Sequence, residues 1–261
     1  MAMRKKTQAA SELVIPPQKK LQFEVFIGGE DISGGMVVVH QFSEKARAEI
    51  RDKQLQHAKP ARGPRIPMDE YVCSKYVDET GLWEGLPCAG FRRAIIDAAS
   101  YVAGITKVSL RGSVFIKAEG HTLDGLNILP ILTASGKADF REDVVRLPTG
   151  SADLRYRSSY TNWGAKLVVV IDPDIISAEQ VHHLIERAGF SVGICEARPQ
   201  KSGEWGQFKL ITEAQFKKLK PVKVTKQEFE VLRTQMGKRN FGGLQNNSGR
   251  MHVAGKPSKA A

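Results

Sequence analysis

A strand, a helix and a second strand follow one another closely in the second half of the chain, and this succession limits the possible folds most. The first strand is expected at residues 163–172, WGAKLVVVID, whose unbroken apolar run is typical of a buried strand. The helix is expected at residues 177–189, where Ser177 and Gln180 are placed as a capping box. The last strand is expected at residues 206–211. A strand, a helix and a strand in this order form one of the two β-α-β units of a split β-α-β fold.

The first half of the chain supplies the other half of this arrangement. The expected elements, in chain order, are strand 21–28, helix 89–103, strand 108–118, strand 164–171, helix 177–188 and strand 206–211. This β-α-β-β-α-β order is that of ferredoxin-like and RNA-recognition folds. The sequence therefore predicts an α+β protein with one ferredoxin-like domain at residues 21–235. Two insertions are expected within it, at about 30–87 and 121–160.

Both insertions carry positive charge. The first holds a basic stretch at residues 45–66, which combines an expected helix at residues 42–56 with the proline-rich loop HAKPARGPRIP. The second contains an expected β-hairpin, whose strands DFREDVVRL and ADLRYRSSY are joined by the turn PTGS. A short helix is expected near KQEFEVLRTQM. Residues 1–20 are expected to form a flexible basic arm, and residues 236–261 a disordered basic tail.

The net charge of +11 over 261 residues suggests a nucleic-acid partner, but most of this charge lies at the two ends. Residues 1–20 carry +4 and residues 237–261 carry +5, which leaves about +2 for the rest. No apolar run approaches the roughly 18 residues of a membrane helix, and no secretory signal is expected. Cys73, Cys88 and Cys195 are odd in number and lack zinc spacing, which suits the reducing cytoplasm.

A glycine-rich stretch, GFSVGICEARPQKSGEWGQFKL, connects the second helix to the last strand. Gly189 is expected to end the helix, and the later glycines allow the backbone to offer its amides to a phosphate. Cationic side chains add charge and Trp205 can stack on a base. The alternative is a structural loop with Trp205 as its hydrophobic plug. The candidate contacts in this loop are Gly193, Arg198, Lys201, Gly203, Trp205 and Gly206.

The hairpin provides a second set of candidate phosphate contacts. Arg155 and Arg157 lie two residues apart on one strand and therefore share a face, where Arg146 can join them across the turn. The alternative is cross-strand ion pairing. The acids available for such pairs are Glu142, Asp143 and Asp153. Arg62 and Arg65 in the proline-rich loop complete the basic candidates of the insertions.

The sheet face opposite the helices is a third candidate. In RNA-recognition modules, aromatic side chains on the central strands stack on bases. Here the matching strands are 21–28 and 164–171, whose outward positions are Gln22, Glu24 and Phe26 in the first and Lys166, Val168 and Val170 in the second. Arg111, Phe115 and Lys117 are expected to point to one side of the neighbouring strand 108–118. The alternative is that Val168 and Val170 are covered and this face is core. The diagnostic string K/R-G-F-G-F-V-x-F is absent, so an orthodox stacking platform is not expected.

Catalytic patterns are scarce. No Walker loop, HExxH or GxSxG occurs, and neither a cofactor nor a metal site is expected. Asp172 and Asp174 are expected to complement a helix N-terminus. His182 and His183 lie within a helix without a recognisable partner.

The stretch AGFSVGICEARPQKSGEWGQFKL after VVVIDPDIISAEQVHHLIER resembles a family of uncharacterised phage and prophage proteins. Their corresponding segment reads VGIGEWRP followed by G-x-x-G-x-F, and DLRYRSSYTNW also fits; the resemblance spans roughly residues 88–211. Cys195 and Ala197 depart from that pattern. More distantly, the spine resembles the RAMP superfamily of CRISPR effector subunits. This fold-level analogy implies binding of single-stranded RNA.

We therefore expect non-catalytic binding of single-stranded RNA or DNA by a homo-oligomer in the cytoplasm of a bacterium, whether phage-encoded or not, without a membrane partner. The basic insertion at residues 45–66 would close over the strand or contact a neighbouring protomer. One alternative is a structural assembly protein. The other is a RAMP-type endoribonuclease, with His40 or His57 in acid–base roles.

Overall fold

The computed structural model describes residues 17–29, 35–42, 44–55, 64–146 and 149–237. The chain is a mixed α and β protein with 34% helix, 33% strand and several antiparallel sheets, which confirms the coarse prediction. Most of the expected basic arm and nearly all of the expected basic tail lie outside the described residues, as do Arg62 and His57. Among the helices of the described part, none is both long and apolar enough to cross a membrane.

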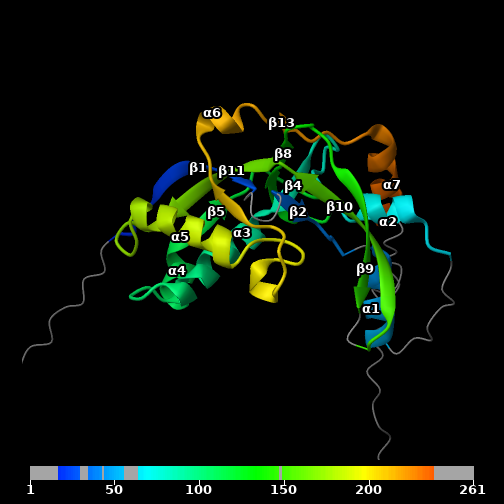
Figure 1. Cartoon of the computed structure of the whole chain (residues 1–261), viewed down its shortest axis with the longest axis horizontal. Helices are drawn as coiled ribbons and strands as arrows, with labels where there is room; N and C mark the ends of the chain where they lie inside the picture. Colours follow the sequence, from blue (N-terminus) through cyan, green and yellow to red (C-terminus); the bar gives the residue numbers. More distant parts are fainter. Residues whose placement is uncertain (1–16, 30–34, 43, 56–63, 147–148, 238–261) are drawn as a thin grey trace, which may run out of the picture.

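Helices and strands are interspersed along the chain (Figure 1). The α-helices are α1 (Glu44–Gln54), α2 (Pro67–Cys73), α3 (Cys88–Ala98), α4 (Lys107–Ser113), α5 (Ala178–Ser191), α6 (Glu213–Phe216) and α7 (Lys226–Gly237), with the short 3₁₀ helices η2 (Ala99–Tyr101) and η3 (Pro199–Lys201). The strands are β1 (Leu21–Gly29), β2 (Met36–Val38), β3 (Tyr76–Val77), β4 (Glu84–Pro87), β5 (Val114–Lys117), β6 (Gly120–His121), β7 (Asn127–Pro130), β8 (Leu132–Thr133), β9 (Asp139–Arg146), β10 (Ala152–Thr161), β11 (Trp163–Ile171), β12 (Phe208–Leu210) and β13 (Lys220–Pro221).

The main sheet is built on β1 and β11, which pair antiparallel from Leu21↔Ile171 to Gly28↔Gly164. Its strand order is β12-β1-β11-β8-β13, and β5 pairs with the other end of β11. The pairs β1–β12, β11–β5 and β11–β8 are also antiparallel. The strands expected from sequence at both ends of the chain therefore meet side by side in one sheet.

One face of this sheet is buried because apolar residues alternate along its two central strands. Val25 and Ile27 of β1 are at most 4% exposed and belong to the same core cluster as Leu167 and Val169 of β11. Helices α3 and α5 pack together on this side, where the ring of Phe91 contacts the rings of Trp163 and Phe208. In Figure 1, α3, α4 and α5 all lie below the main sheet. Among the described residues, no such helical layer covers the opposite face, although α6 contacts β1 at one end.

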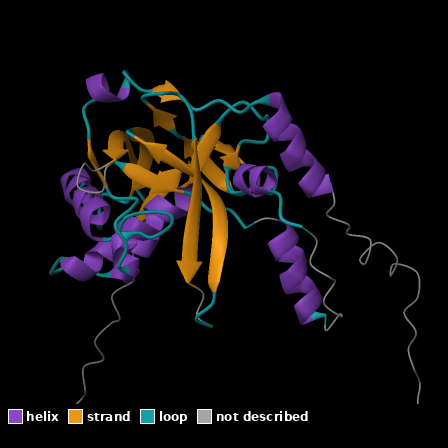
Figure 2. Cartoon of the chain, turned by 45° about the vertical axis from the view of Figure 1, so that its right-hand side comes forward, coloured by secondary structure: helices purple, strands orange, loops and turns teal. Residues whose placement is uncertain are grey.

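Two smaller sheets come from the segments that were expected to be insertions. Strands β2, β10 and β9 form one, and β3, β4, β7 and β6 form the other. The expected hairpin is confirmed as β9 and β10, which pair from Arg146↔Ala152 to Asp139↔Ser159. Figure 2 shows these two long strands projecting away from the body.

The expected strand at residues 108–118 is wrong in its first half, because residues 107–113 form helix α4 and only Val114–Lys117 form β5. The Oγ1 atom of Thr106 accepts a hydrogen bond from the Ser109 amide at 3.1 Å and caps this helix. Helical geometry places residues two apart on different sides. Leu110 is accordingly buried and Val108 exposed, where a strand would have put both on one face.

Gly189 does not end the second helix. The predicted capping box of Ser177 and Gln180 is confirmed at the start of α5, but the helix continues through Gly189 to Ser191. A side chain at position 189 would overlap the carbonyl oxygen of Phe208 in β12. The glycine therefore permits close helix–strand packing, and the tight approach brings the last strand against the helix.

Replacing Gly189 by alanine is expected to destabilise the protein by about 1–3 kcal/mol, the usual cost of overpacking, because the added methyl group overlaps Phe208. Gly112 is the matched control, since it also lies in a helix and a Cβ atom there meets nothing within 4 Å. Gly112→Ala is expected to leave stability unchanged or to raise it by about 0.5–1 kcal/mol. Urea unfolding measures both. Equal stability of the two variants would contradict the close packing of α5 on β12.

Candidate nucleic-acid interface

Strand β5 presents an aromatic and a basic side chain on the helix-free face of the main sheet. Val114 is fully buried and Ile116 packs against the core, so the alternation of the strand turns Phe115 and Lys117 to the opposite face. Phe115 is 45% exposed, and Lys117 is also exposed. An aromatic ring left this open on a sheet is available to stack on a flat ligand.

The guanidinium of Arg92 is held against this ring. Its Nε atom donates to the carbonyl oxygen of Val114 at 2.9 Å, and an Nη atom donates to that of Arg111 at 2.6 Å. These bonds leave the Arg92 Cζ atom 4.5 Å from the centroid of the Phe115 ring, within cation–π distance. The arginine is therefore ordered before any ligand arrives.

The neighbouring positions on this face are apolar or charge-compensated. Phe115 lies opposite Val170, and Val170 lies opposite Gln22, so the row through the aromatic ring carries no acid. In the part of the face nearer to Lys117, the Lys166 ammonium lies 3.4 Å from the carboxylates of both Glu24 and Glu119. Lys166 compensates one of these two carboxylates, and the cations nearest to Phe115 are Arg92, which lies against its ring, and Lys117, which lies two residues along β5.

The opposite end of the same face is partly covered. The ring of Phe26 lies 4.9 Å from that of Phe216 in α6. Of the predicted candidates, Lys117 lies at the open end, whereas Arg111 lies on α4 rather than on a strand. We call the surface formed by Gln22, Phe115, Lys117 and Val170, with the Arg92 guanidinium against the Phe115 ring, the β5 face.

The glycine-rich loop uses its backbone amides internally. Their donors and acceptors are Gly193 to Ala188 (2.8 Å), Ile194 to Gly206 (2.9 Å), Gly203 to Arg198 (3.1 Å), Trp205 to Ala197 (3.0 Å) and Gly206 to Met36 (2.8 Å). Side chains at Gly203 and Gly206 would overlap the carbonyl groups of Ala197 and Ile194. The prediction that these amides are offered to a phosphate is therefore wrong, because the loop is glycine-rich in order to pack on itself.

The other candidates of this loop also have internal partners, with one exception. Arg198 donates to the carbonyl oxygen of Cys195 at 3.1 Å and to the Gln200 side chain at 3.3 Å. Half-buried Trp205 has the Arg141 Cζ atom 4.4 Å from its ring centroid. Lys201 is exposed. These contacts fit the alternative of a structural loop.

A buried carboxylate anchors this loop to two helices. Asp97 of α3 accepts hydrogen bonds from Gln200 of η3 at 2.9 Å, from Arg93 at 2.8 Å and from Lys107 of α4 at 3.0 Å. Burial alone would raise the pKa of Asp97, but the bonds from Gln200, Lys107 and Arg93 outweigh it and lower the pKa to about 2.

Arg157 is buried and ion-paired, which corrects its assignment as a phosphate contact. Its side chain is 3% exposed, and its guanidinium lies 2.7 Å from Asp143 and 3.4 Å from Glu196. Arg157 therefore follows the alternative expectation, in which the arginines of the hairpin form ion pairs with acids on the opposite strand. Arg155, which is half-buried, lies 3.7 Å from Asp153.

Arg65 also has acidic partners. Its guanidinium contacts Glu70 at 2.5 Å and Asp153 at 2.8 Å, and its Cζ atom lies 5.7 Å from the ring centroid of Tyr156. It therefore ties the segment before α2 to the hairpin. Arg62 lies outside the described residues.

The histidines and acids give no catalytic constellation in the described segments. Burial lowers the pKa of His40, and its Nδ1 atom is buried without a hydrogen-bond partner. His182 contacts the carbonyl oxygen of Ala178 through Nδ1. Asp172 accepts from the Asp174 amide, as in a helix-leading turn. No group of three or more potential metal ligands occurs within the described ranges.

Sequence reasoning missed a buried charge cluster at Lys75, which is 2% exposed. Its ammonium lies 2.8 Å from Glu84 and 2.6 Å from Glu228, and the Tyr160 hydroxyl donates to Glu84 at 2.6 Å. Burial lowers the pKa of Lys75, but the two carboxylates outweigh it and raise that pKa. Because Glu228 lies far along the chain, no local pattern connects it to Lys75.

No protein-family model and no curated protein matches this chain. Its function is therefore inferred from its own residues and their geometry.

Replacing Arg157 by alanine is expected to destabilise the fold by about 1–3 kcal/mol, because Asp143 loses its buried partner and keeps only Arg141 at 2.8 Å. Arg155→Ala is the matched control on the same strand and is expected to change stability by less than about 1 kcal/mol. Denaturant unfolding measures both values. An Arg157 variant as stable as the Arg155 variant would show that the buried pair is not structural.

Asp97 is expected to make the protein acid-sensitive. Because its folded pKa lies below the ordinary 3.8, the carboxylate stabilises the fold above that value, and this stabilisation, about 2 kcal/mol, is lost as the pH falls toward 2. Asp97→Asn should lower the stability of the fold at neutral pH. It should also make the loss of stability between pH 3.8 and about pH 2 smaller than in the wild type. Thermal unfolding as a function of pH measures this, and parallel pH profiles would contradict it.

Proposed function

We propose that this protein is a non-catalytic binding module for single-stranded nucleic acid, and that the β5 face is its binding surface. One observation carries the proposal: an exposed aromatic ring, Phe115, lies on the helix-free side of the sheet with a cation held over it. Bases stack on such rings whatever their sequence, because every base has a π-face. Lys117, two residues along the same strand, supplies nearby charge for the phosphates.

A ferredoxin-like core is part of this proposal. Four strands support it: taken in chain order, β1, β5, β11 and β12 lie in the sheet as β12-β1-β11-β5, with antiparallel neighbours. Helix α3 lies between the first two in sequence and α5 between the last two, and both pack on one face. Two interleaved split β-α-β units give this arrangement. The open face of such a sheet is where RNA-recognition modules bind their strand.

The modest number of aromatic side chains on the β5 face favours binding that does not depend on the base sequence. Phosphate neutralisation then dominates the affinity. The three unpaired cysteines support a cytoplasmic location. Phage origin and assembly into a homo-oligomer stay predictions, and the mass of the nucleic-acid-free protein tests the second.

Replacing Phe115 by alanine is expected to weaken binding of a fluorescent single-stranded oligonucleotide about 5- to 150-fold, since one stacked base is worth roughly 1–3 kcal/mol. Lys117→Gln should weaken it less and reduce the slope of log affinity against log salt by about one. Fluorescence anisotropy over a salt series measures both effects.

Phe190→Ala is the matched control, because Phe190 is 56% exposed but lies on helix α5. All variants keep the basic ends of the chain, so any background binding by those ends is the same in each. Either of two results would overturn the proposal: a wild-type affinity that does not change with salt concentration, or equal affinities of the Phe115 and Phe190 variants.

A further inference from the structure

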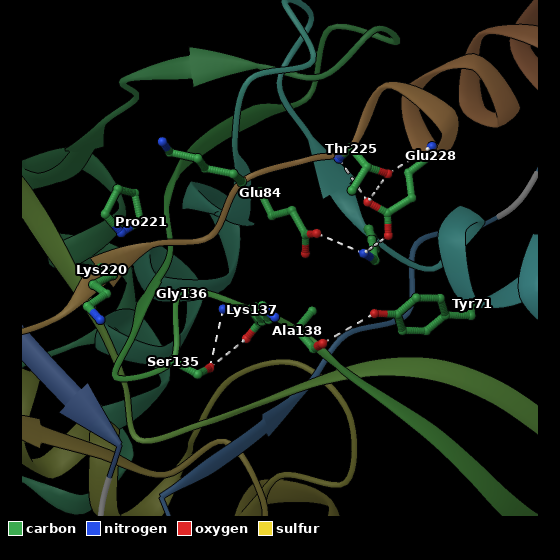
Figure 3. A pocket seen from close by; sticks show the side chains of 12 residues that line it. Tyr71, Glu84, Ser135, Gly136, Lys137, Ala138, Lys220, Pro221, Thr225 and Glu228 are labelled. Atoms are coloured by element: carbon green, nitrogen blue, oxygen red, sulfur yellow. Dashed lines mark hydrogen bonds and ion pairs between the residues drawn. The ribbon is translucent and has the colours of Figure 1, made fainter.

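A cavity of about 650 Å³ lies away from the β5 face, where the β8–β9 connection, β13 and the start of α7 meet. Figure 3 shows Ser135, Gly136 and Lys137 on one side, Lys220 and Pro221 on another, and Glu84 and Glu228 beyond them. Small-molecule sites commonly have volumes of about 300–1,000 Å³. The hollow is therefore large enough for a metabolite-sized ligand.

Three exposed lysines border this cavity: Lys137, Lys220 and Lys223. Within the described part of the chain, none of their ammonium groups forms an ion pair with a carboxylate, whereas neighbouring Lys217 pairs with Glu213 at 2.7 Å. Three like charges around one hollow concentrate positive potential there. We call these residues the lysine rim.

The rim stands on an ordered turn. The Oγ1 atom of Thr133 accepts hydrogen bonds from the amides of Gly136 at 2.9 Å and Lys137 at 3.2 Å. Gly136 has a φ of 69°, and a Cβ atom there would lie 3.2 Å from the Cβ atom of Lys220. The turn and β13 therefore pack closely, which fixes the backbone positions of Lys137 and Lys220 relative to each other.

The floor of the cavity is fixed by the Lys75 cluster. Because Lys75 binds Glu84 of β4 and Glu228 of α7, it joins the start of α7 to the four-stranded sheet. Glu228 also accepts from the amide of Thr225 at 3.0 Å, which caps α7. The amino end of a helix carries partial positive charge. With two acids and one lysine in the floor and three lysines at the rim, the formal charge of the site is positive.

We infer that this cavity binds a small anion with clustered phosphate groups, such as a nucleoside triphosphate or an inorganic polyphosphate. Several ammonium groups around one hollow match several closely spaced negative charges better than a single carboxylate does. Lysine acts as a point charge and suits the oxygens of a phosphate chain. The Tyr71 ring, Ala138 and Pro221 provide apolar lining beside these charges. This site does not depend on the β5 face binding nucleic acid.

Isothermal titration of the full chain with tripolyphosphate, and separately with ATP, tests the inference. The variant carrying Lys220→Gln and Lys223→Gln should bind both probes at least about tenfold more weakly, because charge-assisted hydrogen bonds are lost. The matched control carries Lys217→Gln and Lys218→Gln, which removes the same charge from the preceding segment outside the cavity. It should bind as wild type does.

Thermal unfolding of both double variants without ligand verifies that neither substitution disturbs the fold, which is expected because all four side chains are exposed. Failure of wild type to bind either probe at millimolar concentration would overturn the inference. So would an equal loss of affinity in the two double variants, since it would assign the binding to overall charge. Neither result bears on the Phe115 experiment.

Discussion

The antiparallel pairing of β1 with β11 is the interaction on which the rest of the structure depends. It joins residues 21–28 to residues 164–171 and brings both flanking strands, β12 and β5, into the same sheet. Because the core residues of both strands point to one side, α3 and α5 cover that side only. The uncovered side then exposes whatever the outer strand β5 carries at its alternate positions, and these are Phe115 and Lys117. The candidate interface is thus a direct consequence of strand register.

Much of the chain's charge serves the fold itself. Arg157 binds Asp143 and Glu196, Arg65 binds Glu70 and Asp153, and Lys75 binds Glu84 and Glu228. Each of these cations has one partner that is distant in sequence: Glu196 for Arg157, Asp153 for Arg65 and Glu228 for Lys75. The buried pairs of Arg157 and Lys75 are costly to break, because a buried charge then loses a partner. Among the described residues, Lys117 on the β5 face and the three lysines of the rim are cations without a carboxylate partner.

Local patterns predicted local structure well, including the capping box of Ser177 and the β9–β10 hairpin. They were misleading where the same residues fit both a strand and a helix. Val108 and Leu110 alternate with polar residues as in a strand, but they lie in helix α4, which Thr106 caps. The glycines before β12 were interpreted as space for a ligand, but that space is filled by the chain's own carbonyl groups, which only the folded backbone reveals. The Lys75 cluster had no local signal at all. Phe115 and Lys117 were recognised from alternation, while the Arg92 guanidinium over Phe115 depends on how α3 packs beside β5.

Photocrosslinking of the full chain to a single-stranded oligonucleotide that carries 5-iodouracil tests the central claim most directly, because the halogenated base couples to an aromatic side chain stacked on it. After tryptic digestion and mass spectrometry, the adduct is predicted on the peptide of residues 112–117, at Phe115. An adduct confined to Trp205, or to residues outside the main sheet, would contradict the account and assign the nucleic acid to another surface.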